Sequence, residues 1–301
     1  MVARKKQNPM IIDRAKGCLV GLALGDDNGG PTAMMLRVLE YITYNKSWNM
    51  RDVEKQYLAW FEEDGYDAGL VTHKVLELVN SGASFGEAAR QVDKELDGMT
   101  AGVSPAHRSI PLMLRYVDWY LQSPNFFEEF PNTGFREFES LIKREAELTH
   151  VNKEAGKISV AVNAICLHLI VHRDDFRAIK FGMKFLSYDW AWQDNIFKHI
   201  DSLTINDLSD GGYAPDTLIA ALWFLLNTRS LKDALEQSKE FAGVANYCPV
   251  LVGSIGGAMY GYQEMDSIIN SEGTKELTRI AVATEDNLTI DWQSMKKHDN
   301  N

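Results

Sequence analysis

The sequence predicts an all-α protein, and two patterns support this prediction. Apolar residues recur at helical spacing along most of the chain, as after Asn49, where Val53, Tyr57, Trp60 and Phe61 lie on one helical face. No stretch alternates apolar and polar residues for long enough to predict a sheet. We therefore expect a compact orthogonal bundle of about a dozen helices.

Helix starts are marked along the chain by capping residues. Pro31 suits the first turn of a helix, Asn49 and Ser84 are good N-caps, and a proline- and asparagine-containing loop is expected over 123–133. The interpretation is ambiguous over 188–208, where aromatic residues are frequent. The expected helices cover 11–25, 31–44, 50–62, 70–79, 87–96, 109–121, 135–148, 152–171, 175–186, 217–226, 230–241 and 249–261.

Composition and charge restrict the partners. The 301 residues include 31 Lys and Arg against 42 Asp and Glu, which gives a formal net charge of −11. Nucleic acids and anionic membranes are bound by clustered basic residues, so neither is expected as a partner. The separated cysteines Cys18, Cys166 and Cys248 form no disulfide or zinc motif, which favours the cytoplasm.

A single folded domain is expected over 11–292, because no linker-like composition divides the chain. The basic and proline-containing residues 1–10 are interpreted as a disordered arm, and 293–301 as a polar tail. The longest apolar run, 158–171, is shorter than the roughly 18 residues that span a membrane. It is predicted to be a buried core helix.

Polar, glycine-containing breaks separate the helices at 25–32, 64–69, 102–109, 149–152, 211–217 and 243–249. In the first of them, Asp26, Asp27, Asn28 and Thr32 lie between a helix end and a helix start. A bundle that brought several such breaks together would form one cleft between helices. The breaks therefore predict a polar ligand site.

Four segments resemble signatures of the ADP-ribosylglycohydrolase family. They occur in the family's order over roughly 11–263. The first, Arg14–Asp26, ends in Gly-Asp, and the others are Thr149-His150, Gly211–Trp223 and the glycine-rich Gly253–Gly261. The resemblance implies an all-α enzyme that releases ADP-ribose from modified protein side chains or small conjugates. Its members usually hold two magnesium ions.

The resemblance is weakest at the metal positions. The family's second signature, a Thr-Asp-Asp-Thr helix start, corresponds here to the segment that ends at Thr32. If Gly25–Ala33 is aligned with the first signature instead, Ala33 replaces the glutamate of that signature. Near the C-terminus, Val244 and Asn246 replace two aspartates. Magnesium prefers oxygen ligands that include carboxylates. The usual two-magnesium centre is therefore not expected, and Asp26, Asp27 and Thr32 are the candidates for one remaining Mg²⁺.

Each candidate site residue has a functional and a structural interpretation. Asp26 and Asp27 are candidate acid/base residues for glycosidic cleavage, or they end a helix in solvent. Arg108 suits a diphosphate, whereas His150 suits either the cleft or a structural hydrogen bond. The expected ligand-binding residues are Asn28, Gly29, Thr32, Asp67, Gly69, Ser104, His107, Arg108, His150, Tyr213, Asp216, Asn246, Tyr247 and Cys248.

Three functions remain open from sequence. The first is a metal-poor hydrolase that cleaves the bond between ADP-ribose and a protein side chain or conjugate, with Asp26 as its principal acid/base. The second is a non-catalytic module that binds ADP-ribose or an ADP-ribosylated protein. The third is a structural use of the scaffold, by analogy with crystallin-like relatives. Fold likeness alone does not choose among them.

Overall fold

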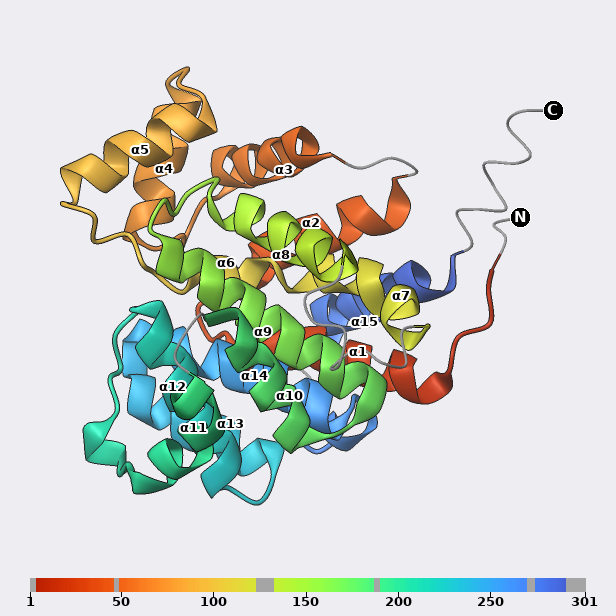
Figure 1. The fold of residues 1–301 in the computed structure, drawn as a ribbon. Helices are drawn as coiled ribbons and strands as arrows, with labels where there is room; N and C mark the ends of the chain where they lie inside the picture. Colours follow the sequence, from red (N-terminus) through yellow and green to blue (C-terminus); the bar gives the residue numbers. More distant parts are fainter. Residues whose placement is uncertain (1–3, 46–48, 123–132, 187–189, 270–273, 291–301) are drawn as a thin grey trace.

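Two glycine-rich helices, α1 (Pro9–Gly25) and α14 (Tyr247–Tyr260), pack side by side in the middle of the molecule (Figure 1). Gly21 of α1 faces Gly253 of α14, and Gly17 faces Gly257. A Cβ atom on Gly253 would lie 2.6 Å from the carbonyl carbon of Gly21, so only glycine permits this approach. We call this contact the glycine seam. It brings the end of α1 next to the start of α14.

The computed structural model describes residues 4–45, 49–122, 133–186, 190–269 and 274–290. Throughout these ranges the regular structure is helical, and the extended pairing consists of two isolated bridges, Arg4–Ile290 and Gly102–Tyr213. The predicted all-α fold is therefore confirmed.

The central helix α9 (Lys153–His172) packs against both helices of the glycine seam and against α6, α8, α10 and α12. Asn152 caps its start by accepting a hydrogen bond from the Glu154 amide, so the helix extends beyond the apolar run 158–171 and covers nearly the same residues as the helix expected over 152–171. At 20 residues it has the length and composition of a membrane span, but 83% of its apolar window is buried inside the protein. This burial fits the predicted core helix.

The other helices lie on two sides of this centre, with α2–α5 and α8 above it and α10–α13 below it in the view of Figure 1. Helix α15 packs against α1 and α2. The bounds are α2 (Gly30–Tyr44), α3 (Met50–Glu63), α4 (Leu70–Asn80), α5 (Phe85–Glu95), α6 (Ser104–Arg108), α7 (Val117–Leu121), α8 (Thr133–Ala146), α10 (Asp175–Met183), α11 (Trp190–Ser202), α12 (Ala214–Asn227), α13 (Leu231–Ala242) and α15 (Thr274–Thr289), with 3₁₀ turns η1 (Ile110–Tyr116), η2 (Lys184–Leu186), η3 (Ile205–Asp207), η4 (Gly243–Ala245) and η5 (Gln263–Met265).

The structure differs from the sequence prediction in the helix expected over 109–121. That segment is divided into η1 and α7, after the short helix α6. Pro111 lies at the start of η1 and has no backbone N–H to donate, so α6 does not continue through it as a regular α-helix.

The N-terminal residues 4–10, expected as part of a disordered arm, are attached to the domain. The Lys5 amide donates to the Thr289 carbonyl, the Arg4 guanidinium pairs with Asp286, and α1 already begins at Pro9. Two further predicted segments, the loop over 123–132 and the tail 293–301, lie outside the described residues.

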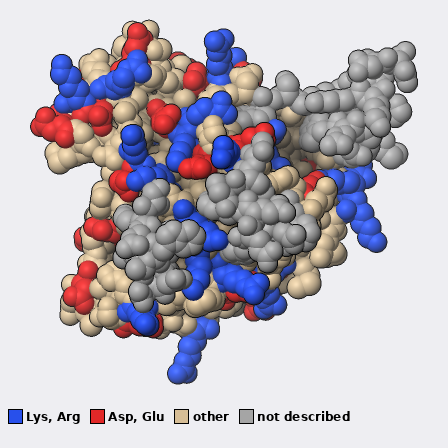
Figure 2. All heavy atoms as spheres, in the orientation of Figure 1, with Lys and Arg blue, Asp and Glu red and all other residues tan. Residues whose placement is uncertain are grey.

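Acidic and basic side chains are mixed on the face shown in Figure 2, where Lys and Arg atoms are frequent near the centre. The net negative charge of the chain therefore does not make every part of the surface acidic.

Candidate functional site

A small pocket lies where the starts of four helices, α2, α4, α6 and α14, come together. The predicted polar breaks supply most of its lining, and the enclosed volume is about 40 Å³. It is lined by Pro31, Met34, Asp67, Ala68, Gly69, Ser104, His107, Ala245, Asn246 and Tyr247. We call it the helix-start pocket. Its floor has room for only a few water molecules, so most of a larger ligand would extend beyond it.

Asp26 lies beside this pocket as the residue that ends α1. Its carboxylate accepts hydrogen bonds at 2.8 Å from the amides of Gly29 and Thr32 and from the side-chain amide of Asn246. The side chain is 8% exposed. Asp26 thus joins the end of α1 to the starts of α2 and α14, and each of its three hydrogen-bond partners there is an N–H donor.

Asp27 points away from Asp26 and towards α13. Its carboxylate is exposed and forms an ion pair with the ammonium group of Lys239, while its backbone amide donates to Asn246 Oδ1 at 3.4 Å. Lys239 therefore places a fixed positive charge beside the acidic end of α1. No sequence motif marks this lysine.

The side chains at this end of α1 do not fit a pair of magnesium ions, which require an octahedral oxygen shell that commonly includes carboxylates. Asp26 accepts three N–H donors, and the exposed Asp27 carboxylate is paired with an ammonium group, whose positive charge disfavours a second cation there. Across the described ranges no group of three or more His, Cys, Asp or Glu side chains is placed to hold a metal. Of the single-magnesium candidates, Thr32 has a buried hydroxyl oxygen with no hydrogen-bond partner among the described residues.

Asn246 and Tyr247 form one wall of the helix-start pocket. Asn246 has a φ of 54°, in the left-handed region that asparagine tolerates better than most residues. The Tyr247 ring lies against Gly212, where a Cβ atom would come within 3.0 Å of it. The neighbouring Val244 is 96% exposed, and the Cys248 thiol is buried, which raises its pKa. Cys248 is therefore poorly suited to act as a nucleophile.

Asp67 is the carboxylate that lines the pocket itself. Partial burial and the negative charge of Asp26 raise its pKa, against hydrogen bonds from the Gly30 amide and the Asn28 side chain. Asn28 also donates to the Val244 carbonyl at 3.3 Å. Gly69 begins α4 without a capping side chain. Among the predicted site residues, Asp67 has the most suitable environment for holding or transferring a proton.

His107 and Ser104 face the pocket from α6. His107 is 2% exposed, and burial lowers its pKa to about 3, so the ring is neutral at physiological pH. Its Nε2 lies 3.1 Å from the Tyr247 carbonyl oxygen, an arrangement in which Nε2–H donates. The Ser104 hydroxyl lies 3.3 Å from that of Thr72. His107 thereby fixes the start of α14 relative to α6.

Arg108, expected to bind a diphosphate, is fully buried and does not line the pocket. Its Nε donates to Glu145 at 2.6 Å, a second guanidinium nitrogen donates to Thr149 at 2.8 Å, and the group stacks over Tyr57. This network links α6 to α8 and α3. The geometry accounts for Arg108 as a structural ion pair.

His150 belongs to the same interior region. Its Nδ1 lies 2.7 Å from the Thr149 hydroxyl, and burial together with the charge of Arg108 lowers its pKa well below the usual value. Tyr213 is 49% exposed as the residue before α12, and Asp216 is exposed in the first turn of that helix. Neither lines the helix-start pocket.

The structure thus divides the predicted residues into three groups. Those that line the pocket are Asp67, Gly69, Ser104, His107, Asn246 and Tyr247; those beside it are Asp26, Asp27, Asn28, Gly29 and Thr32; and Arg108, His150, Tyr213, Asp216 and Cys248 lie elsewhere. Sequence reasoning did not single out the apolar lining residues Pro31, Ala68 and Ala245, which lie within the polar breaks, or Met34, which lies just after the first of them.

Comparison with known proteins identifies the family. The family model described as ADP-ribosylglycohydrolase matches residues 31–289. A solved structure titled "ADP-ribosylglycohydrolase-related protein complex" superposes with a TM-score of 0.66 and 20% identity, over 93% of this chain and 99% of that one. Comparison with curated protein sequences gives no match. The chain belongs to the ADP-ribosylglycohydrolase family.

Proposed function

We propose that this chain binds an ADP-ribose-like ligand at the helix-start pocket and does not use the two-magnesium hydrolysis of its family. The observation that carries the proposal is the engagement of both acidic residues at the end of α1. Asp26 accepts three hydrogen bonds, and Asp27 pairs with Lys239. Asp26 would have to break some of these bonds before it activated water or bound a metal, and the positive charge of Lys239 beside Asp27 disfavours a second cation there.

Backbone N–H groups support the binding part of the proposal. Helices α4 and α14 begin at the pocket, and neither of their N-cap residues forms a side-chain capping hydrogen bond, whereas the first amides of α2 already donate to Asp26 and Asp67. The N-terminal N–H groups and dipoles of helices favour anions such as phosphate. A diphosphate is thus bound without the arginine that the sequence suggests. Asp67 and Asn28 supply groups for ribose hydroxyls.

Metal-free hydrolysis of the glycosidic bond between ADP-ribose and a protein side chain or conjugate is the second candidate function. It is favoured by the raised pKa of Asp67, which lies at the pocket and pairs with no cation among the described residues. In that case Asp67, rather than Asp26, would act as the general acid or base. The substrate would be an ADP-ribosylated protein or a small ADP-ribose conjugate.

Calorimetric titration with ADP-ribose, in chelator and in millimolar Mg²⁺, tests the proposal. We expect the same affinity in both solutions, and about tenfold weaker binding in Asp67→Asn, since that change removes one charge-assisted hydrogen bond. The control is Asp64→Asn, in the same connection but outside the pocket. An affinity that appears only with Mg²⁺ would refute the metal-free site.

An assay for ADP-ribose release from ADP-ribosylated protein separates the remaining alternatives. Binding without release supports the non-catalytic module. Release that is lost in Asp67→Asn and kept in Asp64→Asn would establish the second candidate. The absence of both binding and release would leave the structural use of the scaffold.

A further inference from the structure

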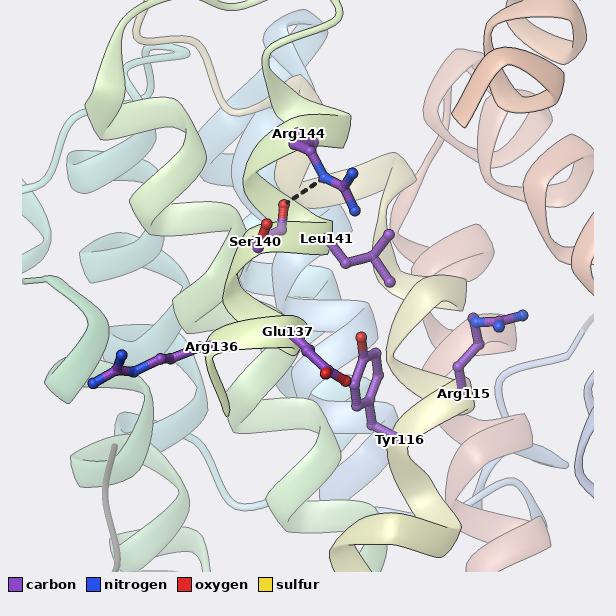
Figure 3. Close-up of a pocket in the computed structure, with 7 residues that line it drawn as sticks. All are labelled: Arg115, Tyr116, Arg136, Glu137, Ser140, Leu141 and Arg144. Atoms are coloured by element: carbon purple, nitrogen blue, oxygen red, sulfur yellow. Dashed lines mark hydrogen bonds between the residues drawn. The ribbon is translucent and has the colours of Figure 1, made fainter. Parts of the chain in front are cut away.

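A second, larger pocket lies between η1 and α8, away from the helix starts. Its volume is about 500 Å³, within the range of small-molecule sites. It is lined by Arg115, Tyr116, Arg136, Glu137, Ser140, Leu141 and Arg144 (Figure 3). None of these residues lines the helix-start pocket. We call it the arginine pocket.

The charge of this pocket is opposite to that of the chain. Three arginines and one glutamate line it, in a protein whose formal net charge is −11. Arg136 and Arg144 are both exposed, and neither forms an ion pair with any carboxylate of the described residues. Arg144 donates from Nε to the Ser140 carbonyl at 3.3 Å. Its two terminal nitrogens remain for an anion.

The cations are spread rather than focused on one point. In Figure 3 the side chains of Arg115 and Arg136 extend on opposite sides of the pocket, and Arg144 lies above Leu141. A single small anion cannot reach all three guanidinium groups. The arrangement favours a ligand that carries several separated negative charges.

The wall between the arginines is partly apolar and fixed by packing. Leu141 is 3% exposed, and the Tyr116 ring packs edge-on against Phe138 at 5.2 Å. Burial raises the pKa of Tyr116, so its phenol keeps its proton at neutral pH and can donate a hydrogen bond to an anion in the pocket. Glu137 lies beside the ring and would repel an anion at that point (Figure 3).

We propose that the arginine pocket binds an oligophosphate, either inorganic or as the phosphate chain of a small organic molecule. The planar guanidinium fork matches phosphate oxygens in two-point hydrogen bonds. A nucleic acid is disfavoured, because the strongly acidic protein repels a long polyanion and the pocket offers only three cations.

Titration with tripolyphosphate at low salt tests this proposal, because that probe contains no nucleoside or ribose. Arg136→Gln and Arg144→Gln should each weaken binding about tenfold, and the double variant about a hundredfold. Arg90→Gln, an exposed arginine on α5, is the matched control and should bind as the parent protein does. Adenosine triphosphate compared with tripolyphosphate distinguishes an organic from an inorganic ligand.

The outcomes that overturn the proposal are specific. They are no binding of tripolyphosphate, an unchanged affinity in the double variant, or tighter binding of hexaglutamate or of a single-stranded oligonucleotide than of tripolyphosphate. Thermal unfolding of each variant shows whether it is folded. The Arg136→Gln/Arg144→Gln double variant should bind ADP-ribose at the helix-start pocket as the parent protein does, so that failure here is separable from failure at that pocket.

Discussion

Replacing Gly253 by alanine tests whether the glycine seam positions the site. The new methyl group would lie 2.6 Å from the carbonyl carbon of Gly21, whereas ordinary contacts begin near 3.4 Å. Helices α1 and α14 must therefore separate by about 1 Å in a close-packed interior. Such overpacking costs about 1–3 kcal/mol or more, whereas alanine in place of glycine in a helix contributes about 1 kcal/mol of stability. We expect a net loss of about 2 kcal/mol in the free energy of unfolding.

Urea denaturation measures this loss, and Gly156→Ala in α9 is the matched control. A Cβ atom on Gly156 meets its nearest neighbour, the Lys143 side chain, at 3.5 Å, which is ordinary contact. That variant should therefore be as stable as the parent or up to about 1 kcal/mol more stable. If Gly253→Ala proves as stable as Gly156→Ala, the seam does not determine the helix spacing.

Three further changes have predictable results. Asn246→Asp puts a second carboxylate beside Asp26 in place of a 2.8 Å hydrogen bond, so it should lower the free energy of unfolding by about 1–3 kcal/mol at pH 7. Millimolar Mg²⁺ should raise the thermal unfolding midpoint of this variant and leave that of the parent protein unchanged. Glu145→Gln weakens the partner of the buried Arg108 and should cost about 3 kcal/mol in urea denaturation, whereas Glu139→Gln, in an exposed pair, should cost under about 1 kcal/mol. His107 has a folded pKa of about 3, below its ordinary 6.5, so its contribution to stability is complete above pH 6.5 and is lost as the pH falls towards 3. Between pH 7 and pH 4, the unfolding free energy of His107→Gln should therefore fall by less than that of the parent protein, and an equal fall would contradict this assignment.

The sequence predicted the fold class because helical periodicity is a local signal. The glycines of α1 are visible in the sequence, but the helix they pack against lies more than 200 residues away and was seen only in the structure. The predicted convergence of polar breaks holds for the starts of α2, α4, α6 and α14, each of which lies within or directly after one of the breaks. Local patterns therefore found the pieces of the pocket.

The sequence could not say which side chains remain available to a ligand. Arg108 looked suitable for a diphosphate, but its partner Glu145 lies 37 residues further on, on another helix. The pairing of Asp27 with Lys239 spans 212 residues. Such pairings depend on how the helices are packed, and no spacing rule within one chain predicts them. The roles of the pocket residues themselves remain predictions.

The glycine seam also has a consequence for how the protein is made. The hydrogen bond between Asn246 and Asp26 spans 220 residues, and ribosomes add about 5–20 residues per second, so α1 would wait roughly 10 to 45 s for its partner helix during synthesis. Through that time the bare glycine face of α1 has no α14 to cover it. Helix α1 is thus completed by its contacts only after α14 has been made, and nascent chains truncated before α14 should be recognised by chaperones or proteases through the uncovered face of α1.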